Sequence, residues 1–505
     1  MPAFSGCDVA IVGGGASGTL LAVNLLRSAR APFRVVIVER SGLLGRGLAY
    51  STRSPRHLLN VPAARMGALP EDAEHFLRWL RKTWPDTAPG DFVPRDRYGL
   101  YLESLLRDVA ARAPAGVQLE TVPAEVVSVQ EEGGRVRLAL ASGGWVEARA
   151  AVLAVGNAVP ADLRVPDGGL YASERYHRSP WASWALRDVG PRDSVLLIGT
   201  GLTMVDTVLS LEEQGHQGVM HALSRHGLLP HVHRAGALER SMAYSSPGIR
   251  DVLRALRQEV MRECEEAVGA DGHLHPIPVR IRAVLRIMRQ EVKRATDAGA
   301  DWRAVVDALR PATVPLWHRL TPGERRRFLR HLRSHWEVHR HRMAPAIGET
   351  VERLRREGRL VLHAGRVRSF RLEDSGVEVR LRPRGREAEE VLHVQHVVNC
   401  TGPEGAITRA HPLLQEMVAA GRVCPDVLGM GLATDAHGAL MDLSGHASGL
   451  LFTLGPPRRG ELWETTAVPE IRVQARALAE HLLQRLGTAP VTRVPMVHTG
   501  LPLDR

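Results

Sequence analysis

The hydrophobic and polar positions of this chain follow the same order in two separate stretches, residues 7–40 and residues 194–225. Each stretch has a short apolar run, a glycine-rich turn, a segment with helical periodicity and a second apolar run. This order predicts a strand, a helix and a second strand in both places. The pattern is typical of an α/β protein with parallel sheets.

Both second apolar runs end in a charged residue at the same spacing. Glu39 lies 26 residues after Gly13, and Arg225 lies 26 residues after Gly199. The equal spacing indicates one βαβ motif used twice.

The similarity continues downstream of each motif. Residues 117–157 and residues 360–402 both contain short runs of alternating polarity and then a continuous apolar run that ends in a glycine, Gly156 or Gly402. We expect a small meander of strands in each copy, followed by a return to a buried parallel strand.

The second copy is longer than the first by about 60 residues. The additional residues have helical periodicity, for example in 251–268, 279–295 and 322–342. They predict a helical insertion at 246–357 beside the second motif.

Length and composition favour a globular multidomain protein, since 505 residues with 44% hydrophobic content can bury large cores. We find no run of 18 uncharged apolar residues and no signal-peptide pattern at the first residues, so we expect no membrane span and a cytoplasmic protein. The four cysteines form no CxxC pair, which argues against a redox-active dithiol. Oligomeric state is not indicated by the sequence.

The net charge of +11 raises the question of nucleic acid as a partner. Lys82 and Lys293 are the only lysines, and the arginines are spread along the chain without a basic tail or an aromatic-basic module. We therefore expect no nucleic-acid partner. Local arginine clusters could favour an anionic small-molecule substrate.

The first glycine turn has the form GxGxxG, with Gly13, Gly15 and Gly18 between a strand and a helix. These glycines permit a tight turn, close approach of a pyrophosphate and close helix packing, and the helix start offers free N–H groups to phosphate. Glu39 can accept hydrogen bonds from the adenosine ribose. The first motif therefore predicts a Rossmann-like FAD domain, with cofactor-binding candidates Gly13, Gly15, Ser17, Gly18, Glu39, Arg40 and Gly156.

The second turn retains Gly199 and Gly201 but has Met204 in place of the third glycine. A cation at Arg225, where the first motif has an acid, suits a 2′-phosphate better than a free ribose, so we expect NADPH, with NADH possible. The alternative is that Arg225 is an ordinary solvated arginine. The candidates here are Gly199, Gly201, Leu202, Thr203, Arg225 and Gly402.

These motifs divide the chain into three expected regions. The FAD-binding domain is expected at 1–165 and 365–505, and the NAD(P)H-binding domain at 190–245 plus part of 345–400. The helical insertion at 246–357 is the expected substrate region.

The segment before the second motif resembles the FxGxxxHxxxW signature of class B flavin monooxygenases, with HxxxW matched by His177 and Trp181. The match is partial, because Ser173 stands where the signature has glycine. The resemblance makes His177 and Trp181 catalytic candidates. The alternative is a packed linker.

Over nearly its whole length the chain is similar to a bacterial family described as FAD/NAD(P)-binding proteins. The similarity is carried by GRGLAYST at 45–52, HLLNVPAARM at 57–66, LIGTGLTMVD at 197–206, DWRAVVDALRP at 301–311 and NCTGP at 399–403. Some relatives are amine N-oxygenases, including enzymes that oxidise the amino group of aspartate, which implies a reaction type without fixing a substrate.

The resemblance also implies that Arg46, Tyr50, His57 and Asn60 lie on the FAD side of the cleft. Thr466 and Ala467 precede the last predicted helix, whose positive end could stabilise reduced flavin, or could be an ordinary N-cap.

Three HxH pairs, at 231/233, 273/275 and 339/341, stand without converging carboxylates or cysteines, so we expect no metal site. Arg340 and Arg342, in the insertion, are candidates for contact with an anion.

Together these features predict an FAD-dependent, NADPH-using oxidoreductase, a monooxygenase that uses dioxygen to oxygenate a small polar substrate such as an amine or amino acid. One alternative is a flavin reductase or dehydrogenase without oxygen insertion. Another is a non-catalytic redox regulator, since the fold alone does not select the chemistry.

Overall fold

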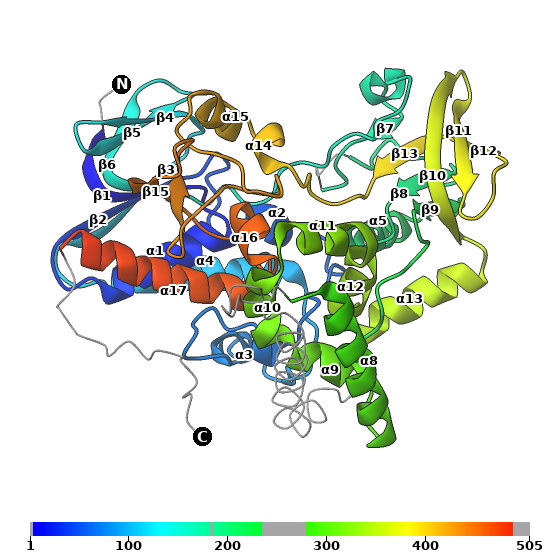
Figure 1. Ribbon diagram of the computed structural model, residues 1–505, viewed down its shortest axis with the longest axis horizontal. Coiled ribbons are helices and arrows are strands. Elements are labelled where there is room, and N and C mark those ends of the chain that lie inside the picture. The colour runs from blue at the N-terminus through cyan, green and yellow to red at the C-terminus, as the bar shows by residue number, and fades with distance from the viewer. Residues whose placement is uncertain (1–3, 182–184, 235–278, 488–505) are drawn as a thin grey trace, which may run out of the picture.

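Two sheets lie side by side in the computed structural model, which describes residues 4–181, 185–234 and 279–487 (Figure 1). Each sheet carries helices, and further helices lie between the two units. The predicted class, two Rossmann-like units with a helical insertion, is confirmed. The predicted helix at 251–268 lies outside the described residues.

The first sheet has the strand order β14-β15-β6-β1-β2-β3, with β4 and β5 in a meander that joins β6. The strands β1, β2, β3 and β6 pair in parallel. Their bounds are β1 Phe4–Val12, β2 Phe33–Val38, β3 Val117–Val122, β4 Val126–Glu132, β5 Arg135–Leu140, β6 Trp145–Leu153, β14 Ala439–Met441 and β15 Ala447–Thr453.

Helices cover both faces of the first sheet. On one face, α1, α4 and α17 pack against the strands in one apolar core, and on the other the meander packs with α15. The central strand β1 is buried on both faces, which explains its continuous apolar run. The bounds are α1 Ala16–Ser28, α3 His75–Arg81, α4 Arg95–Ala111, α14 Ile407–Ala410, α15 Pro412–Ala419 and α17 Val468–Arg485.

The second sheet has the order β12-β11-β10-β9-β8-β13-β7. The helices α5 and α13 share one apolar core with β8, β9 and β13. The bounds are β7 Tyr176–His177, β8 Val195–Ile198, β9 Met220–Ser224, β10 Leu360–Glu373, β11 Gly376–Pro383, β12 Glu390–Val394, β13 His396–Asn399, α5 Leu202–Glu213 and α13 Pro345–Arg356.

The two sheets differ where the last parallel strand leads into the meander. In the first unit, β3 ends at Val122 and β4 begins at Val126, and between them lies Pro123, which cannot donate a ladder hydrogen bond. In the second unit, β10 is one strand that pairs in parallel with β9 and then antiparallel with β11.

The strand topology corrects one expected boundary. The strands β10 to β13 belong to the second sheet, so the part of the chain that returns to the first sheet begins after Asn399, and not at residue 365. The reason is that the second meander serves its own parallel sheet, as the first meander does.

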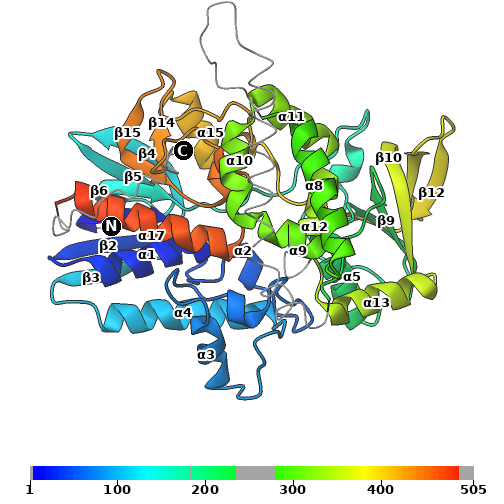
Figure 2. The same cartoon turned by 60° about the horizontal axis from the view of Figure 1, so that its bottom comes forward.

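The insertion is helical over its described part and lies between the two units in both views (Figure 2). Trp317 donates its indole N–H to the Gly460 carbonyl of the first unit at 2.9 Å, and His231 of the second unit donates its backbone N–H to the Val338 carbonyl at 3.0 Å. The insertion therefore contacts both units. The bounds are α8 Ile281–Asp297, α9 Trp302–Ala308, α10 Thr313–Arg319, α11 Pro322–His331 and α12 Arg333–Arg340.

Candidate functional site

The first glycine turn is packed so closely that two of its glycines have no room for a side chain. A Cβ on Gly13, which has a φ of +103°, would lie 2.5 Å from the Ala154 carbonyl oxygen. A Cβ on Gly18 would lie 2.0 Å from the Gly13 carbonyl oxygen. Gly15 precedes α1 as its N-cap. The turn thus holds the start of α1 against the carboxyl end of β1.

Glu39 lies beside this turn, at the end of β2. Its carboxylate accepts the Gly14 backbone N–H at 2.8 Å and the Ser41 backbone N–H at 2.9 Å. This places an acceptor where a ribose would bind. The adjacent Arg40 side chain is 74% exposed and lies 3.9 Å from Glu125, so it points away from the turn.

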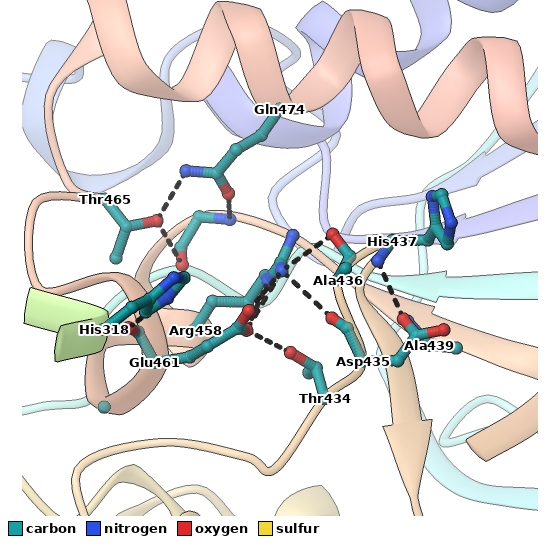
Figure 3. A network of polar contacts seen from close by, with 12 residues as sticks. His318, Thr434, Asp435, Ala436, His437, Ala439, Arg458, Glu461, Thr465 and Gln474 are labelled. Carbon is teal, nitrogen blue, oxygen red and sulfur yellow. Dashed lines mark hydrogen bonds and ion pairs between the residues drawn. The ribbon is translucent and has the colours of Figure 1, made fainter. Parts of the chain in front are cut away.

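The loop before α17 lies against the first turn. Ser17 is buried, and a Cβ on Gly455 would lie 2.7 Å from its hydroxyl oxygen. Thr465 is also buried and donates to the Gly455 carbonyl at 2.9 Å (Figure 3). Thr466 is exposed, and Ala467 is the N-cap of α17 without a side-chain cap. In the first turn of α17, Pro469 has no N–H and Glu470 donates its N–H to the Ala467 carbonyl, which leaves the Val468 N–H as the free donor of this turn among the described residues.

A network of polar contacts holds the loop before α17 in place (Figure 3). The buried Arg458 binds both carboxylate oxygens of Glu461 at 3.0 Å and donates to the carbonyls of Asp435 and Ala436. Gln474 on α17 bridges Thr465 and Gly455. Such satisfied buried networks hold a backbone in one conformation.

The second glycine turn is more open than the first. A Cβ on Gly199, φ +112°, would lie 2.4 Å from the Cys400 carbonyl oxygen, whereas a Cβ on Gly201 would meet nothing within 4 Å. Met204, in the third position, is fully buried in the core of the second unit. Leu202 and Thr203 form the first turn of α5 and are partly exposed.

Arg225 follows β9 and is exposed. Burial lowers the pKa of the adjacent His226, as do the charges of Arg384, His335, Arg225 and Arg366. Arg225 after β9, Arg366 within β10 and Arg384 after β11 therefore act on the same place. We call these three exposed arginines the cationic surface around Arg225.

The structure separates the two members of the HxxxW pattern. His177 is buried at the edge of the second sheet, where its Nε2 lies 3.1 Å from Nδ1 of His396. Burial lowers the pKa of His177 to about 4. Trp181 instead lies against His57, with ring centroids 6.1 Å apart, and under Arg95. The packing of His177 is that of a buried sheet residue.

The residues expected on the FAD side occupy two different places. Arg46 pairs with Glu103 at 3.1 Å, and its Nε is buried without a hydrogen-bond partner among the described residues. Tyr50 packs on Tyr98, and burial raises the pKa of Tyr50 to about 12. Both lie at or beside the short helix α2, Gly47–Tyr50, which follows the first turn.

His57 and Asn60 lie further along, where this loop contacts the second unit. The buried His57 has Nε2 3.0 Å from the Asp206 carbonyl on α5 and Nδ1 2.7 Å from the Thr52 hydroxyl. The Asn60 carbonyl accepts from His233 at 3.1 Å. These contacts join the two units.

Sequence reasoning missed the ion pair at the centre of this junction. Arg95 on α4 binds Asp206 on α5 at 2.7 Å, and the Asp206 side chain is 5% exposed. Arg56 reinforces the junction by pairing with Glu212 at 2.6 Å. The signal was present, because an acid on the apolar face of α5 requires a buried partner.

A family model described as FAD-NAD(P)-binding matches residues 10–158, which include the first glycine turn, Glu39 and Gly156. The first unit is an FAD/NAD(P)-binding domain. The match thus covers the same segment in which the geometry gathers the cofactor candidates.

Comparison with known proteins extends the similarity of fold to the rest of the chain. The chain is 28% identical over 265 residues to nitrosuccinic acid synthase of Aspergillus oryzae, an alignment of 48% of this chain and 40% of that protein. The structure matches L-lysine 6-monooxygenase of Pseudomonas syringae with a TM-score of 0.61 at 15% identity, covering 95% of this chain and 99% of the other. It matches ornithine N-hydroxylase of Kutzneria sp. 744, solved with reduced FAD, NADP+ and L-ornithine, with a TM-score of 0.56 at 15% identity, covering 96% and 100%. The FAD/NAD(P)-binding domain therefore stands within a fold shared over both units.

The residues present fit two dinucleotides. In the FAD/NAD(P)-binding domain, Cβ atoms on Gly13 and Gly18 would clash with backbone, and Gly156 at the end of the sheet would meet nothing within 4 Å. In the second unit, Gly201 and Gly402 likewise face open space. Pyrophosphate needs this combination of bare backbone and room at a helix start.

Two further observations concern other ligands. In the part of the chain that the structure describes, no helix has the length and apolar character to cross a bilayer, and no three histidine, cysteine or acidic side chains are grouped to hold a metal. The pair at 231/233 diverges, since His231 packs on Trp302 while His233 reaches Asn60. The pair at 273/275 lies outside the described residues.

Proposed function

We propose that the protein is an FAD-dependent, NADPH-using monooxygenase that oxygenates the nitrogen of a small amine or amino acid. The observation that carries the proposal is the presence of two glycine turns of the dinucleotide-binding type in one chain, one beside the acceptor Glu39 and one beside the cation Arg225. The resemblance to nitrosuccinic acid synthase and the shared fold with two amino-acid N-oxygenating enzymes support the reaction type.

The overall reaction balances as amine, dioxygen, NADPH and a proton giving hydroxylamine, NADP+ and water. FAD, when bound, would take the hydride from NADPH and pass the two electrons to dioxygen, one oxygen atom going to the substrate nitrogen and the other to water.

The residues of the chain would bind and orient the two dinucleotides. Gly13, Gly15 and the start of α1 would hold the FAD pyrophosphate, Ser17 would support that turn, and Glu39 would hold the ribose. Gly201, Leu202 and Thr203 would present backbone N–H groups to the NADPH pyrophosphate. The start of α17 at Thr466 and Ala467 would place partial positive charge against the flavin ring.

The cationic surface around Arg225 supports NADPH over NADH. Arg225, Arg366 and Arg384 act on the same point beside β9, and a 2′-phosphate would bring the negative charge that such a surface favours.

The test is anaerobic mixing of the purified holoprotein with NADPH or NADH, followed by oxygen, with and without a panel of amines and amino acids. We expect reduction of the flavin preferring NADPH, and a substrate-dependent yield of hydroxylamine at the expense of hydrogen peroxide. Reduction with peroxide as the product under every substrate would instead support a reductase. If neither NADPH nor NADH reduces the flavin, both the monooxygenase and the reductase hypotheses are contradicted.

A further inference from the structure

A cluster of arginines and glutamates lies where α12 of the insertion meets the start of α17. It is defined by five arginines and three glutamates: Arg310, Arg333, Arg340, Arg459, Arg472, Glu337, Glu464 and Glu470. The cluster therefore has two more guanidinium groups than carboxylates. Surplus positive charge in a partly buried cluster favours the binding of an anion.

Most members of this cluster have a partner within hydrogen-bond distance. Arg310 binds both oxygens of Glu470 at 2.6 and 2.9 Å, and the Trp336 indole N–H donates to Glu464 at 2.9 Å. Arg333 binds Glu337 at 2.8 Å.

Arg340, the last residue of α12, is the exception. Its side chain is 9% exposed, yet NH2 lies 3.8 Å from Glu464 and 3.7 Å from Glu470, beyond hydrogen-bond distance. Its Nε and NH2 are buried without a hydrogen-bond partner among the described residues. A buried guanidinium N–H without an acceptor is costly, which makes Arg340 a candidate to bind an anionic ligand.

Two neighbours show the same deficit. The Nε atoms of Arg459 and Arg472 are buried and lack a hydrogen-bond partner within the described chain. Unsatisfied donors from α12, α16 (Arg459–Leu462) and α17 thus belong to one cluster. The guanidinium group offers parallel N–H donors, which match the two oxygens of a carboxylate.

The position of Arg340 connects this deficit to the reaction. Glu464 immediately precedes Thr465, and Glu470 lies in the first turn of α17, so Arg340 approaches the loop that would face the flavin. It does so from the insertion, which contacts both units.

We propose that Arg340 binds a carboxylate of the substrate, so that the enzyme selects amines that carry an acidic group. The inference rests on the proposed function for the identity of the ligand as substrate. Glu464 and Glu470 then hold the guanidinium in place without satisfying it, which leaves its donors for the ligand.

The test uses a ligand that cannot react, so that it does not depend on turnover. Succinate is titrated calorimetrically into FAD-loaded protein, with uncharged succinamide as the matched ligand. We expect succinate to bind and succinamide not to, and Arg340→Met to weaken succinate binding at least about tenfold, since hydrogen bonds to a charged group are lost. Arg330→Met, at an exposed arginine of α11, is the matched control and should leave binding unchanged.

Folding is checked by FAD content and thermal melting of each variant. If Arg340→Met fails to fold, Arg340→Lys decides the matter, because lysine retains the charge and loses the paired donors; succinate binding should again fall. Equal succinate binding in wild type and in the folded Arg340 variant would overturn the proposal, as would absence of succinate binding to wild type, or loss of FAD with unchanged succinate affinity.

The two proposals fail in different ways. If no amine is oxygenated while succinate binding still depends on Arg340, the anion site stands and the proposed function is wrong. If amines are oxygenated and Arg340→Met binds succinate normally, the proposed function stands and the carboxylate contact is wrong.

Discussion

The two dinucleotide units have the same strand order around their turns but pack them differently. In the first unit the third glycine, Gly18, is so close to the Gly13 carbonyl that no Cβ fits. In the second unit the equivalent Met204 is fully buried in the core. Since Met204 carries the Cβ that Gly18 cannot, α5 must sit differently over its turn than α1 does. One motif therefore tolerates two packing solutions.

The charged residue after the second strand differs as well. Glu39 is already bound to the turn through the Gly14 N–H, whereas Arg225 is exposed among other cations. The first unit thus uses this position to order its own turn, and the second presents an exposed cation there.

The largest effect is expected from giving the first unit the residue of the second. Gly18→Met would place a side chain 2.0 Å from the Gly13 carbonyl oxygen, so we expect failure to fold or a protein without FAD. The measurement is the FAD-to-protein absorbance ratio after purification. Gly201→Ala, where the Cβ meets nothing within 4 Å, is the control and should fold with normal FAD content. A yellow Gly18→Met protein would show that the two turns are interchangeable.

Next in size is truncation at the same position of the second unit. Met204→Ala should destabilise the protein by about 2–5 kcal/mol through the cavity it leaves in a fully buried site. Thermal unfolding should shift to lower temperature while the folded protein keeps its FAD, because the residue lies in the other core. Loss of FAD at a temperature where the protein stays folded would contradict the separation of the two cores.

A third prediction concerns the stability of the folded protein at low pH. Burial lowers the pKa of His177 to about 4 from 6.5, and lowers that of His221 to about 4 as well, both in the second sheet. The unfolded chain therefore binds protons that the folded chain does not. Stability is complete above pH 6.5 and falls as the pH drops toward 4, by about 3 kcal/mol for His177.

This prediction is measured as the change in unfolding free energy between about pH 7.5 and about pH 5. His177→Asn should reduce the change, whereas His331→Gln, at an exposed histidine, should not. An identical pH dependence in His177→Asn and wild type would contradict the assignment.

The smallest effect is expected at Arg225. Arg225→Gln removes one of several cations, so we expect KM for NADPH to rise by about tenfold and KM for NADH to change little. Arg30→Gln, at an exposed arginine of the first unit, is the control. Equal changes with both nucleotides would mean that Arg225 does not contact the 2′-phosphate.

The repeated βαβ pattern was predictable from sequence because buried parallel strands and glycine turns leave local signals. The helical character of the insertion was also visible in its periodicity. The exact break between β3 and β4, beside Pro123, was not among the boundaries predicted from the sequence.

The site was predictable where a turn dictates it and unpredictable where two distant segments meet. Gly13, Gly18 and Glu39 lie together because a single motif brings them together. Arg95 and Asp206 are more than a hundred residues apart, and no local pattern relates them. The HxxxW spacing relates two residues that the structure places against different partners, His177 against His396 and Trp181 against His57, so the role predicted for them stays a prediction.

The junction made by His57, Arg95 and Asp206 has a consequence for motion. Rotation of one unit against the other would expose a carboxylate that is 5% exposed in the closed junction and would separate its ion pair. We therefore expect no hinge rotation between the two units during the reaction cycle. The radius of gyration of the protein in X-ray scattering should be the same with and without nucleotide.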